Sequence, residues 1–160
     1  MRKIKAVKCF VAMLLPDEMI QFKTSRKTDW KIARRFIGRD NMGKPQYATR
    51  FYICTNWKYH DLYPEETKTF LDDFYARCPI GKDFSIITLT ILHEVGHIKT
   101  WNKVNWWEDG LFRQLCDDQS EYIQLDAEYK ATQWAIDWLS DPSNQKIAHN
   151  FAHIFFSCKW

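Results

Sequence analysis

The chain lacks several features that would assign it to a common class of protein. No stretch approaches about eighteen uninterrupted apolar residues, so we expect no membrane-spanning helix. Internal repeats and low-complexity segments are also missing, which excludes solenoids and repetitive linkers. There is no glycine-rich phosphate loop and no serine nucleophile elbow, so neither nucleotide hydrolysis nor serine-hydrolase chemistry is supported.

Cysteine is present, but in no pattern that builds a site. The cysteines are odd in number and widely spaced, without a CxxC pair: Cys9, Cys54, Cys78, Cys116 and Cys158. A thiolate zinc site or a dithiol redox motif is therefore excluded. We expect reduced, mostly buried thiols and a cytoplasmic protein.

The first sixteen residues, MRKIKAVKCFVAMLLP, combine a basic start with an apolar run, as a secretion signal does. However, Lys8 interrupts the run, Pro16 ends it, and no small-residue cleavage site follows. We therefore predict an amphipathic helix over residues 3 to 15 with its apolar side turned inward, and no membrane partner.

The net charge of +3 is mild, and the only dense group of basic residues spans Lys23 to Arg39, where Asp29 is the single acid. Nucleic-acid-binding proteins concentrate positive charge on one face. We interpret this segment as a solvated or substrate-facing helix surface, with a nucleic-acid patch as the less favoured alternative. No nucleic-acid partner is expected.

The pattern of apolar and turn-forming residues predicts one α+β domain, residues 1–160, dominated by helices with a small β-sheet. A short helix is expected over 29–37 with Asp29 as its cap, then a turn-rich segment and a strand over 47–56. Further helices are expected from Pro64 onward and over 84–100, 121–140 and 143–157, with Asp83 as the cap of the second.

The 84–100 helix contains the sequence HExxH, formed by His93, Glu94 and His97. Apolar residues surround this helix on every side, which is typical of a central, buried helix. Histidines four apart share a helix face, so both imidazoles can bind one zinc ion at about 2.0–2.1 Å. Glu94 stands about 100° round the helix, where it can take a proton from a water on the metal. The alternative is a pair of core histidines satisfied by carbonyls or acids.

A catalytic zinc ion usually has three protein ligands, so one ligand is still missing. The short-spaced third histidine of some zinc peptidases is absent, because Thr100 and Lys103 occupy the positions that would mark it. The next long helix offers three acids: Glu121, Asp126 and Glu128. We favour Glu128, because it shares a side with Ala135 and Thr132, beside the apolar stripe. Thr132, one turn later, can hydrogen-bond a ligand imidazole and fix its tautomer.

These two segments, LTILHEVGHIKTW and DAEYKATQWAIDWL, resemble the zincin metallopeptidases of the gluzincin type. The nearest likeness is to the ImmA/IrrE family and to small metallopeptidase-like proteins of phages and prophages. That family's pattern is HExxH, roughly thirty residues, and then E-x-E-A-N-x-F-A. Glu128 takes the ligand position here, while Lys130 and Thr132 replace the second glutamate and the asparagine. Ala131 and Ala135 match, Trp134 takes the position of the aromatic residue, and the likeness covers roughly residues 85 to 140.

The resemblance implies a minimal zincin-like domain with one zinc ion that hydrolyses a peptide bond. In this scheme the zinc polarises the carbonyl and Glu94 activates the water. The substrate would be a protein or peptide, bound as an extra strand along a sheet edge, for which TRFYICTN is the candidate. If a phage encodes the chain, the compartment would be the host cytoplasm.

Two matters stay open at the level of sequence. The donor that would stabilise the oxyanion has four candidates: Tyr122, Tyr129, His149 and His153. The last two are also spaced four apart, without an intervening glutamate, and otherwise form an ordinary helix face. The alternative function is a non-catalytic regulator or interaction protein of phage or prophage origin that keeps the zincin scaffold.

Overall fold

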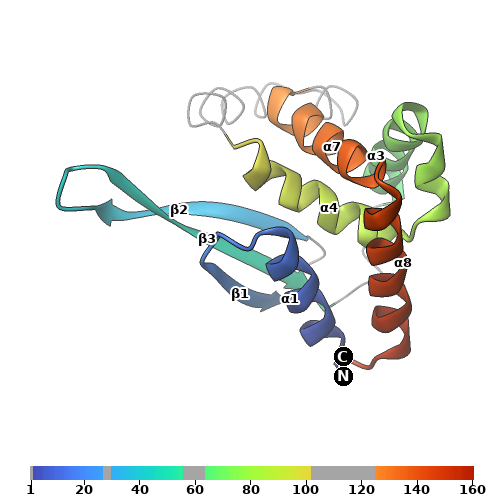
Figure 1. Ribbon diagram of the computed structural model, residues 1–160, viewed down its shortest axis with the longest axis horizontal. Helices are drawn as coiled ribbons and strands as arrows, with labels where there is room; N and C mark the ends of the chain where they lie inside the picture. The colour runs from blue at the N-terminus through green and yellow to red at the C-terminus, as the bar shows by residue number, and fades with distance from the viewer. Residues whose placement is uncertain (1, 27–29, 56–63, 102–124) are drawn as a thin grey trace.

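The computed structural model of the chain describes residues 2–26, 30–55, 64–101 and 125–160 (Figure 1). Within these ranges the fold is α+β and mostly helical, as the sequence predicts. In chain order the elements are α1 (Lys3–Leu14), β1 (Ile20–Ser25), β2 (Lys31–Arg39), β3 (Pro45–Cys54), α3 (Pro64–Arg77), a 3-10 turn (Pro79–Asp83), α4 (Ile86–Lys99), α7 (Asp126–Leu139) and α8 (Pro142–Ser157).

The three described strands form one mixed sheet in the order β1-β3-β2. β1 runs parallel to β3 and places Phe22 beside Phe51, while β2 runs antiparallel and places Ile32 beside the same residue. A tight turn joins β2 to β3, where Asp40 Oδ1 accepts a hydrogen bond from the Met42 amide at 2.9 Å. β3 is therefore the central strand, and β2 is an edge of the sheet as far as the structure describes it.

Two sequence predictions about this region are wrong. Most of the segment 29–37, expected to be a helix, belongs to β2, and its proposed cap Asp29 lies outside the described residues. Pairing with β3 and the burial of Ile32 against Phe51 override the local helical tendency of KIARR, as tertiary contacts often do. The strand predicted at 47–56 exists as β3, but TRFYICTN cannot offer an open edge because β3 has a neighbour on both sides.

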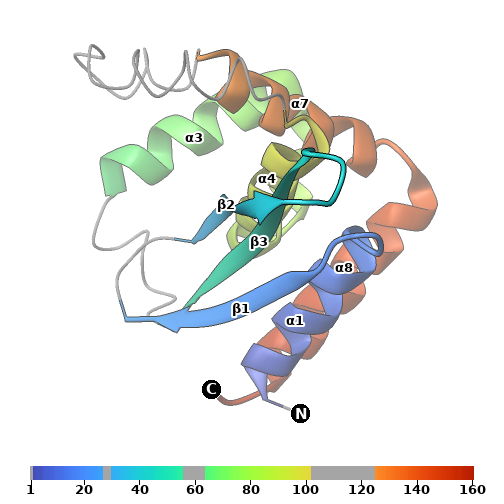
Figure 2. The same ribbon diagram turned by 90° about the vertical axis from the view of Figure 1, so that its left-hand side faces the viewer.

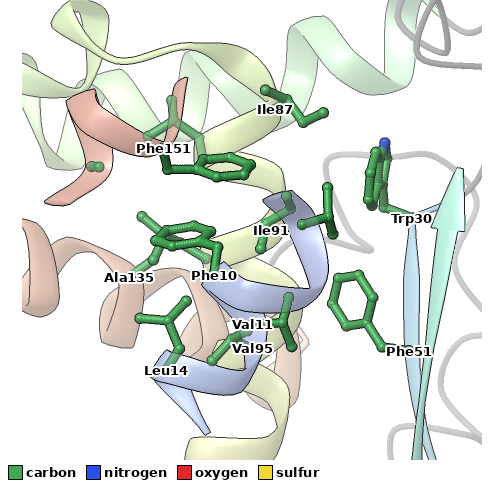
Figure 3. Close-up of a cluster of buried hydrophobic side chains, with 14 of the residues drawn as sticks. Phe10, Val11, Leu14, Trp30, Phe51, Ile87, Ile91, Val95, Ala135 and Phe151 are labelled. Carbon is green, nitrogen blue, oxygen red and sulfur yellow. The ribbon is translucent and has the colours of Figure 1, made fainter. Parts of the chain in front are cut away.

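Helix α4 occupies the centre of the molecule, as its all-round apolar surface predicts. Leu89, Ile91, Leu92 and Val95 are fully buried. Figure 3 shows Ile91 and Val95 within a layer of apolar side chains that separates the helices from the sheet. Burying each such side chain stabilises the fold by roughly 1.5–3 kcal/mol, so α4 is fixed firmly relative to its neighbours.

The start of α4 differs from the prediction. Ser85, not Asp83, is the N-terminal cap, because its side chain accepts a hydrogen bond from the Thr88 amide at 3.3 Å. Asp83 instead ends the preceding 3-10 turn and is exposed. The turn Pro79–Asp83 separates α3 from α4, and the helix therefore begins later in the chain than the sequence suggests.

The first and last helices pack against each other and join the two ends of the chain. The rings of Phe10 on α1 and Phe151 on α8 stack with centroids 4.2 Å apart. The Lys3 amide donates to the Lys159 carbonyl at 2.7 Å, and Lys3 Nζ donates to the Phe155 carbonyl. The termini consequently lie side by side (Figure 1).

No helix in the described ranges is long and apolar enough to cross a membrane. Of the four cysteines in these ranges, Cys54 and Cys78 are buried and Cys9 is exposed. The expectation of mostly buried thiols is therefore only half met, and Cys116 lies outside the described residues.

Replacing the cap of α4 tests where this helix begins. We expect Ser85→Ala to lower the free energy of unfolding by about 1 kcal/mol, because the Thr88 amide loses its side-chain acceptor. Asp83→Ala is the matched control and should change stability by less than about 0.5 kcal/mol, since Asp83 is exposed. Urea denaturation measures both, and a larger loss for Asp83→Ala would contradict the assignment.

Candidate metal centre

Three polar side chains of α4 lie together in the interior of the fold. His93 is only 9% exposed, while Glu94 and His97 are partly buried. The two imidazole rings have centroids 4.7 Å apart and planes at 84°. Candidate ligand atoms of His93, Glu94 and His97 all lie within 4.8 Å of one another. The predicted convergence of HExxH on one helix face is therefore present.

Helix α7 brings Glu128 directly onto the two imidazoles. Its Oε2 atom lies 2.8 Å from His93 Nε2 and 3.2 Å from His97 Nε2, and the residue is 5% exposed. Asp126, an alternative from the sequence, is exposed and forms an ion pair with Lys130 one turn along the helix. Glu121 lies outside the described residues. Of the two candidate acids that the structure describes, Glu128 is the one placed against both histidines.

The charge state of Glu128 follows from these contacts. Burial on its own would raise the pKa of this carboxyl, but His97 and His93 together hold the pKa well below its usual range. Glu128 is therefore a carboxylate, which only accepts hydrogen bonds and needs positive charge or donors around it. A buried anion between two imidazoles is a chemical environment that favours a cation.

Glu94 faces a different neighbour. Its Oε2 atom accepts a hydrogen bond from the Ile32 amide of β2 at 3.0 Å, so the edge strand holds this carboxylate. Burial raises the pKa of Glu94 above its ordinary value, and the Glu128 carboxylate adds to the rise, against the opposing effect of the histidines and the Ile32 amide. Glu94 and Glu128 therefore differ in both position and proton affinity.

Thr132 holds the second ring nitrogen of His93. The Thr132 hydroxyl lies 2.9 Å from His93 Nδ1, and both residues are buried. A hydroxyl can accept a hydrogen bond from an Nδ1–H group or donate one to a bare Nδ1. When Nε2 binds a metal, Nδ1 carries the proton, and the Thr132 hydroxyl oxygen can then accept a hydrogen bond from the Nδ1–H group and fix the orientation of the ring.

Gly96 allows α4 and α7 to approach closely enough for these contacts. A Cβ atom built at Gly96 would lie 2.4 Å from the backbone oxygen of Ala131, which no real side chain tolerates. Ala131 lies between Glu128 and Thr132 in sequence, so the point of closest approach is flanked by the two residues that contact His93. The small size of Gly96 thus sets the distance between imidazole and carboxylate.

The arrangement fits a zinc ion in donor type and spacing. Two atoms bound at about 2.0–2.1 Å in tetrahedral geometry are roughly 3.3 Å apart. The separations of Glu128 Oε2 from the two Nε2 atoms, 2.8 and 3.2 Å, are close to this value. Two imidazoles and one carboxylate form a donor set that zinc accepts. His93, His97 and Glu128 are the residues that could hold it.

The candidate oxyanion donors that lie in the described residues have other surroundings. Tyr129 is 44% exposed and its ring lies under the Arg77 guanidinium, 3.9 Å from its centroid. His149 is exposed on α8 and stacks on Phe84 with centroids 4.5 Å apart. His153 is exposed on the same helix, and Tyr122 lies outside the described residues.

Sequence reasoning missed three contributors to this centre. The Ile32 amide could not be found while residues 29–37 were expected to form a helix. Phe70 of α3 packs edge-on against His93, with ring centroids 5.2 Å apart, and gives no recognisable signal in the sequence. Gly96 does give a signal in the sequence. A glycine inside a helix lowers the stability of the helix by about 1 kcal/mol, so its presence suggests a close contact at that position.

Comparison with known proteins identifies no relative: no protein family, no curated protein and no solved structure matches the chain.

Enlarging Gly96 should separate the two helices. Helix propensity alone predicts that Gly96→Ala stabilises α4 by about 1 kcal/mol. Because the new methyl group meets the Ala131 carbonyl, we expect a net loss of about 1–3 kcal/mol instead. Urea denaturation in the presence of a chelator measures this apart from any metal effect. Lys99→Ala, an exposed change on the same helix, is the control, and a stabilised Gly96→Ala protein would contradict the close contact.

Removing the Thr132 hydroxyl should weaken metal binding without removing a ligand. We expect Thr132→Val to raise the dissociation constant for zinc about 10- to 100-fold, because His93 Nδ1 loses its partner. Thr132→Ser keeps the hydroxyl and should stay within a few-fold of the wild type. Competition titration with a zinc chelator dye gives both constants. Equal affinities for the two variants would argue against a role for the hydroxyl.

Proposed function

We propose that the chain is a zinc-dependent peptidase. The observation that carries the proposal is the position of the Glu128 carboxylate against both imidazoles of HExxH, while Glu94 is held separately by the Ile32 amide. Glu128 is therefore suited to metal binding, and Glu94 to proton transfer. The resemblance of both helices to the zincin metallopeptidases of the ImmA/IrrE type supports the same assignment.

His93, His97 and Glu128 would hold the zinc ion. When bound, the ion would supply a Lewis acid for a peptide carbonyl and for a water molecule at the open position. Thr132 would keep the His93 ring in the orientation that presents Nε2 to the site. The surrounding apolar side chains, among them the partly buried Phe70, limit the access of bulk water and strengthen the electrostatic interactions within the centre.

Glu94 would serve as the general base and then as the general acid. A raised pKa makes its carboxylate a better proton acceptor than an exposed glutamate, since burial disfavours the charged form. The hydrogen bond from Ile32 fixes one carboxylate oxygen, which directs the group without protonating it. Glu94 would take a proton from the attacking water and deliver it to the leaving amine.

The substrate strand would lie along β2, not along β3 as the sequence suggested. Since the Ile32 amide points to Glu94, it points away from β3. Backbone groups alternate along an antiparallel strand, so those of Arg34 and, two positions on, Phe36 face the same side. An extended peptide paired with this edge would pass directly beside Glu94. The expected substrate is therefore a protein or peptide segment in extended conformation.

The free thiols at Cys9, Cys78 and Cys158 favour a reducing compartment, and we retain the cytoplasm as the proposed location. A phage or prophage origin, and with it the host cytoplasm, rests on the family resemblance alone.

Three carboxyl-to-amide variants test the roles of the acids. We expect Glu94→Gln to retain zinc but to lose hydrolysis of an unfolded protein such as casein by at least about 100-fold, because no base remains. Glu128→Gln should lose zinc, since an amide is a poor replacement for the buried carboxylate. Asp126→Asn removes the same charge from an exposed position of the same helix and should change neither property.

Zinc content by mass spectrometry and hydrolysis by fluorescence release are measured on the same samples. Hydrolysis that persists in Glu94→Gln would reject the proposed base, and a wild-type chain without stoichiometric zinc would reject the site. Stoichiometric zinc without hydrolysis of any peptide would favour the alternative, a non-catalytic regulator that keeps the scaffold.

A further inference from the structure

The face of the sheet that points away from the helices has an unusual charge pattern. The three strands contain six lysines and arginines and no acidic residue. Thr49, Phe51 and Ile53 of β3 are buried toward the helices, so the alternating residues Arg50 and Tyr52 point to the opposite face. The helical layer lies on one side of the sheet, where Figures 2 and 3 show α4 and α1.

The strand register arranges these outer residues around one aromatic ring. Tyr52 on the central strand is paired with Lys23 of β1 on one side and with Lys31 of β2 on the other. Neighbouring strands are about 4.8 Å apart, so the two lysine backbones are separated by roughly 10 Å with the ring between them. Arg50 lies on the same face two positions earlier, and its Nε donates to Gln21 at 2.8 Å. We call Lys23, Lys31, Arg50 and Tyr52 the basic sheet face.

The cations of this face are not neutralised by the described part of the chain. Lys23 and Lys31 are exposed and form no ion pair there, and no aromatic ring of the described residues packs on the partly buried Tyr52. Arg34 on the inner face differs, because Glu18 pairs with it at 2.5 Å and the Trp101 ring packs against its guanidinium. Among the residues that the structure describes, Glu18 therefore compensates the charge of Arg34 on the inner face, and no acidic side chain pairs with Lys23 or Lys31 on the outer one.

We propose that the basic sheet face binds single-stranded nucleic acid. A flat sheet that presents an aromatic ring offers a stacking surface for a base, and cations on both sides of the ring can contact the flanking phosphates. An acidic protein could form ion pairs with the cations, but the Tyr52 ring between them would add no specific contact to such a partner. The expectation of no nucleic-acid partner rested on the mild net charge and on the interpretation of Lys23 to Arg39 as a solvated or substrate-facing helix surface. The strand β2 that forms instead places Lys31 on this face.

This surface is independent of the proposed peptidase activity. Glu94 lies with α4 on the helical side of the sheet, whereas the basic sheet face lies on the other side. A bound oligonucleotide and a bound peptide would not compete for the same atoms. Glu94→Gln should therefore bind nucleic acid like the wild type, whether or not the chain hydrolyses peptides.

Fluorescence anisotropy with a labelled dodecathymidylate at 50–200 mM salt tests the proposal. We expect binding that weakens with salt, and a loss of at least about tenfold in the triple variant Lys23→Gln, Lys31→Gln, Arg50→Gln. The slope of log affinity against log salt should become shallower by about 2, because three phosphate contacts are lost from a single strand. Tyr52→Leu should lose about fivefold or more while Tyr52→Phe retains binding, since only the ring is needed for stacking.

A second triple variant, Lys5→Gln, Lys82→Gln, Lys146→Gln, removes the same charge from exposed positions outside the sheet. Circular dichroism confirms that each variant is folded before binding is compared. The proposal is overturned if the two triple variants lose equal affinity, if Tyr52→Leu binds like the wild type, or if the wild type does not bind at 50 mM salt. Displacement by polyglutamate as effective as by unlabelled oligonucleotide would identify an acidic protein as the partner and overturn it equally.

Discussion

The close contact between Gly96 and the Ala131 carbonyl determines the distance between the two helices that build the site. Every interaction of Glu128 and Thr132 with the histidines spans this interface, at separations of 2.8 to 3.2 Å. Hydrogen bonds and metal bonds weaken steeply when such distances grow by a few tenths of an ångström. A glycine in the middle of HExxH is therefore a structural requirement of the centre as well as a local cost to the helix.

The site also depends on both layers of the fold. The helical layer supplies the two imidazoles and the Glu128 carboxylate, while the sheet contributes the Ile32 amide that holds Glu94. Most of α4 is buried among apolar residues, which holds its three polar side chains in the interior of the fold. The apolar surroundings thereby fix the positions of the polar groups of HExxH relative to one another.

The sequence predicted those parts of the site that depend on local periodicity. His93, His97 and Glu94 follow from the spacing of one helix, and Glu128 with Thr132 from the apolar stripe of another. Pairing between distant segments could not be predicted from the sequence. The segment β2 contains a run with helical tendency, and it forms a strand because it pairs with β3. The same limitation gave the wrong edge strand, because strand order is set by the whole sheet. Asp83 was predicted as the cap of α4 in place of Ser85, because the 3-10 turn that precedes this helix was not predicted.

The junction of the chain ends has a consequence for how the protein is made. Lys3 contacts Phe155, 152 positions later in the chain, and Phe10 stacks on Phe151. During synthesis on the ribosome, α1 emerges well before α8, so its apolar side is not fully covered until α8 has been made. Until then Phe10, Val11 and Leu14 have no complete packing partner, and the nascent chain exposes a surface that attracts chaperones or other chains. Closure of the core, and with it the final positioning of α4, is therefore expected only after α8 has emerged.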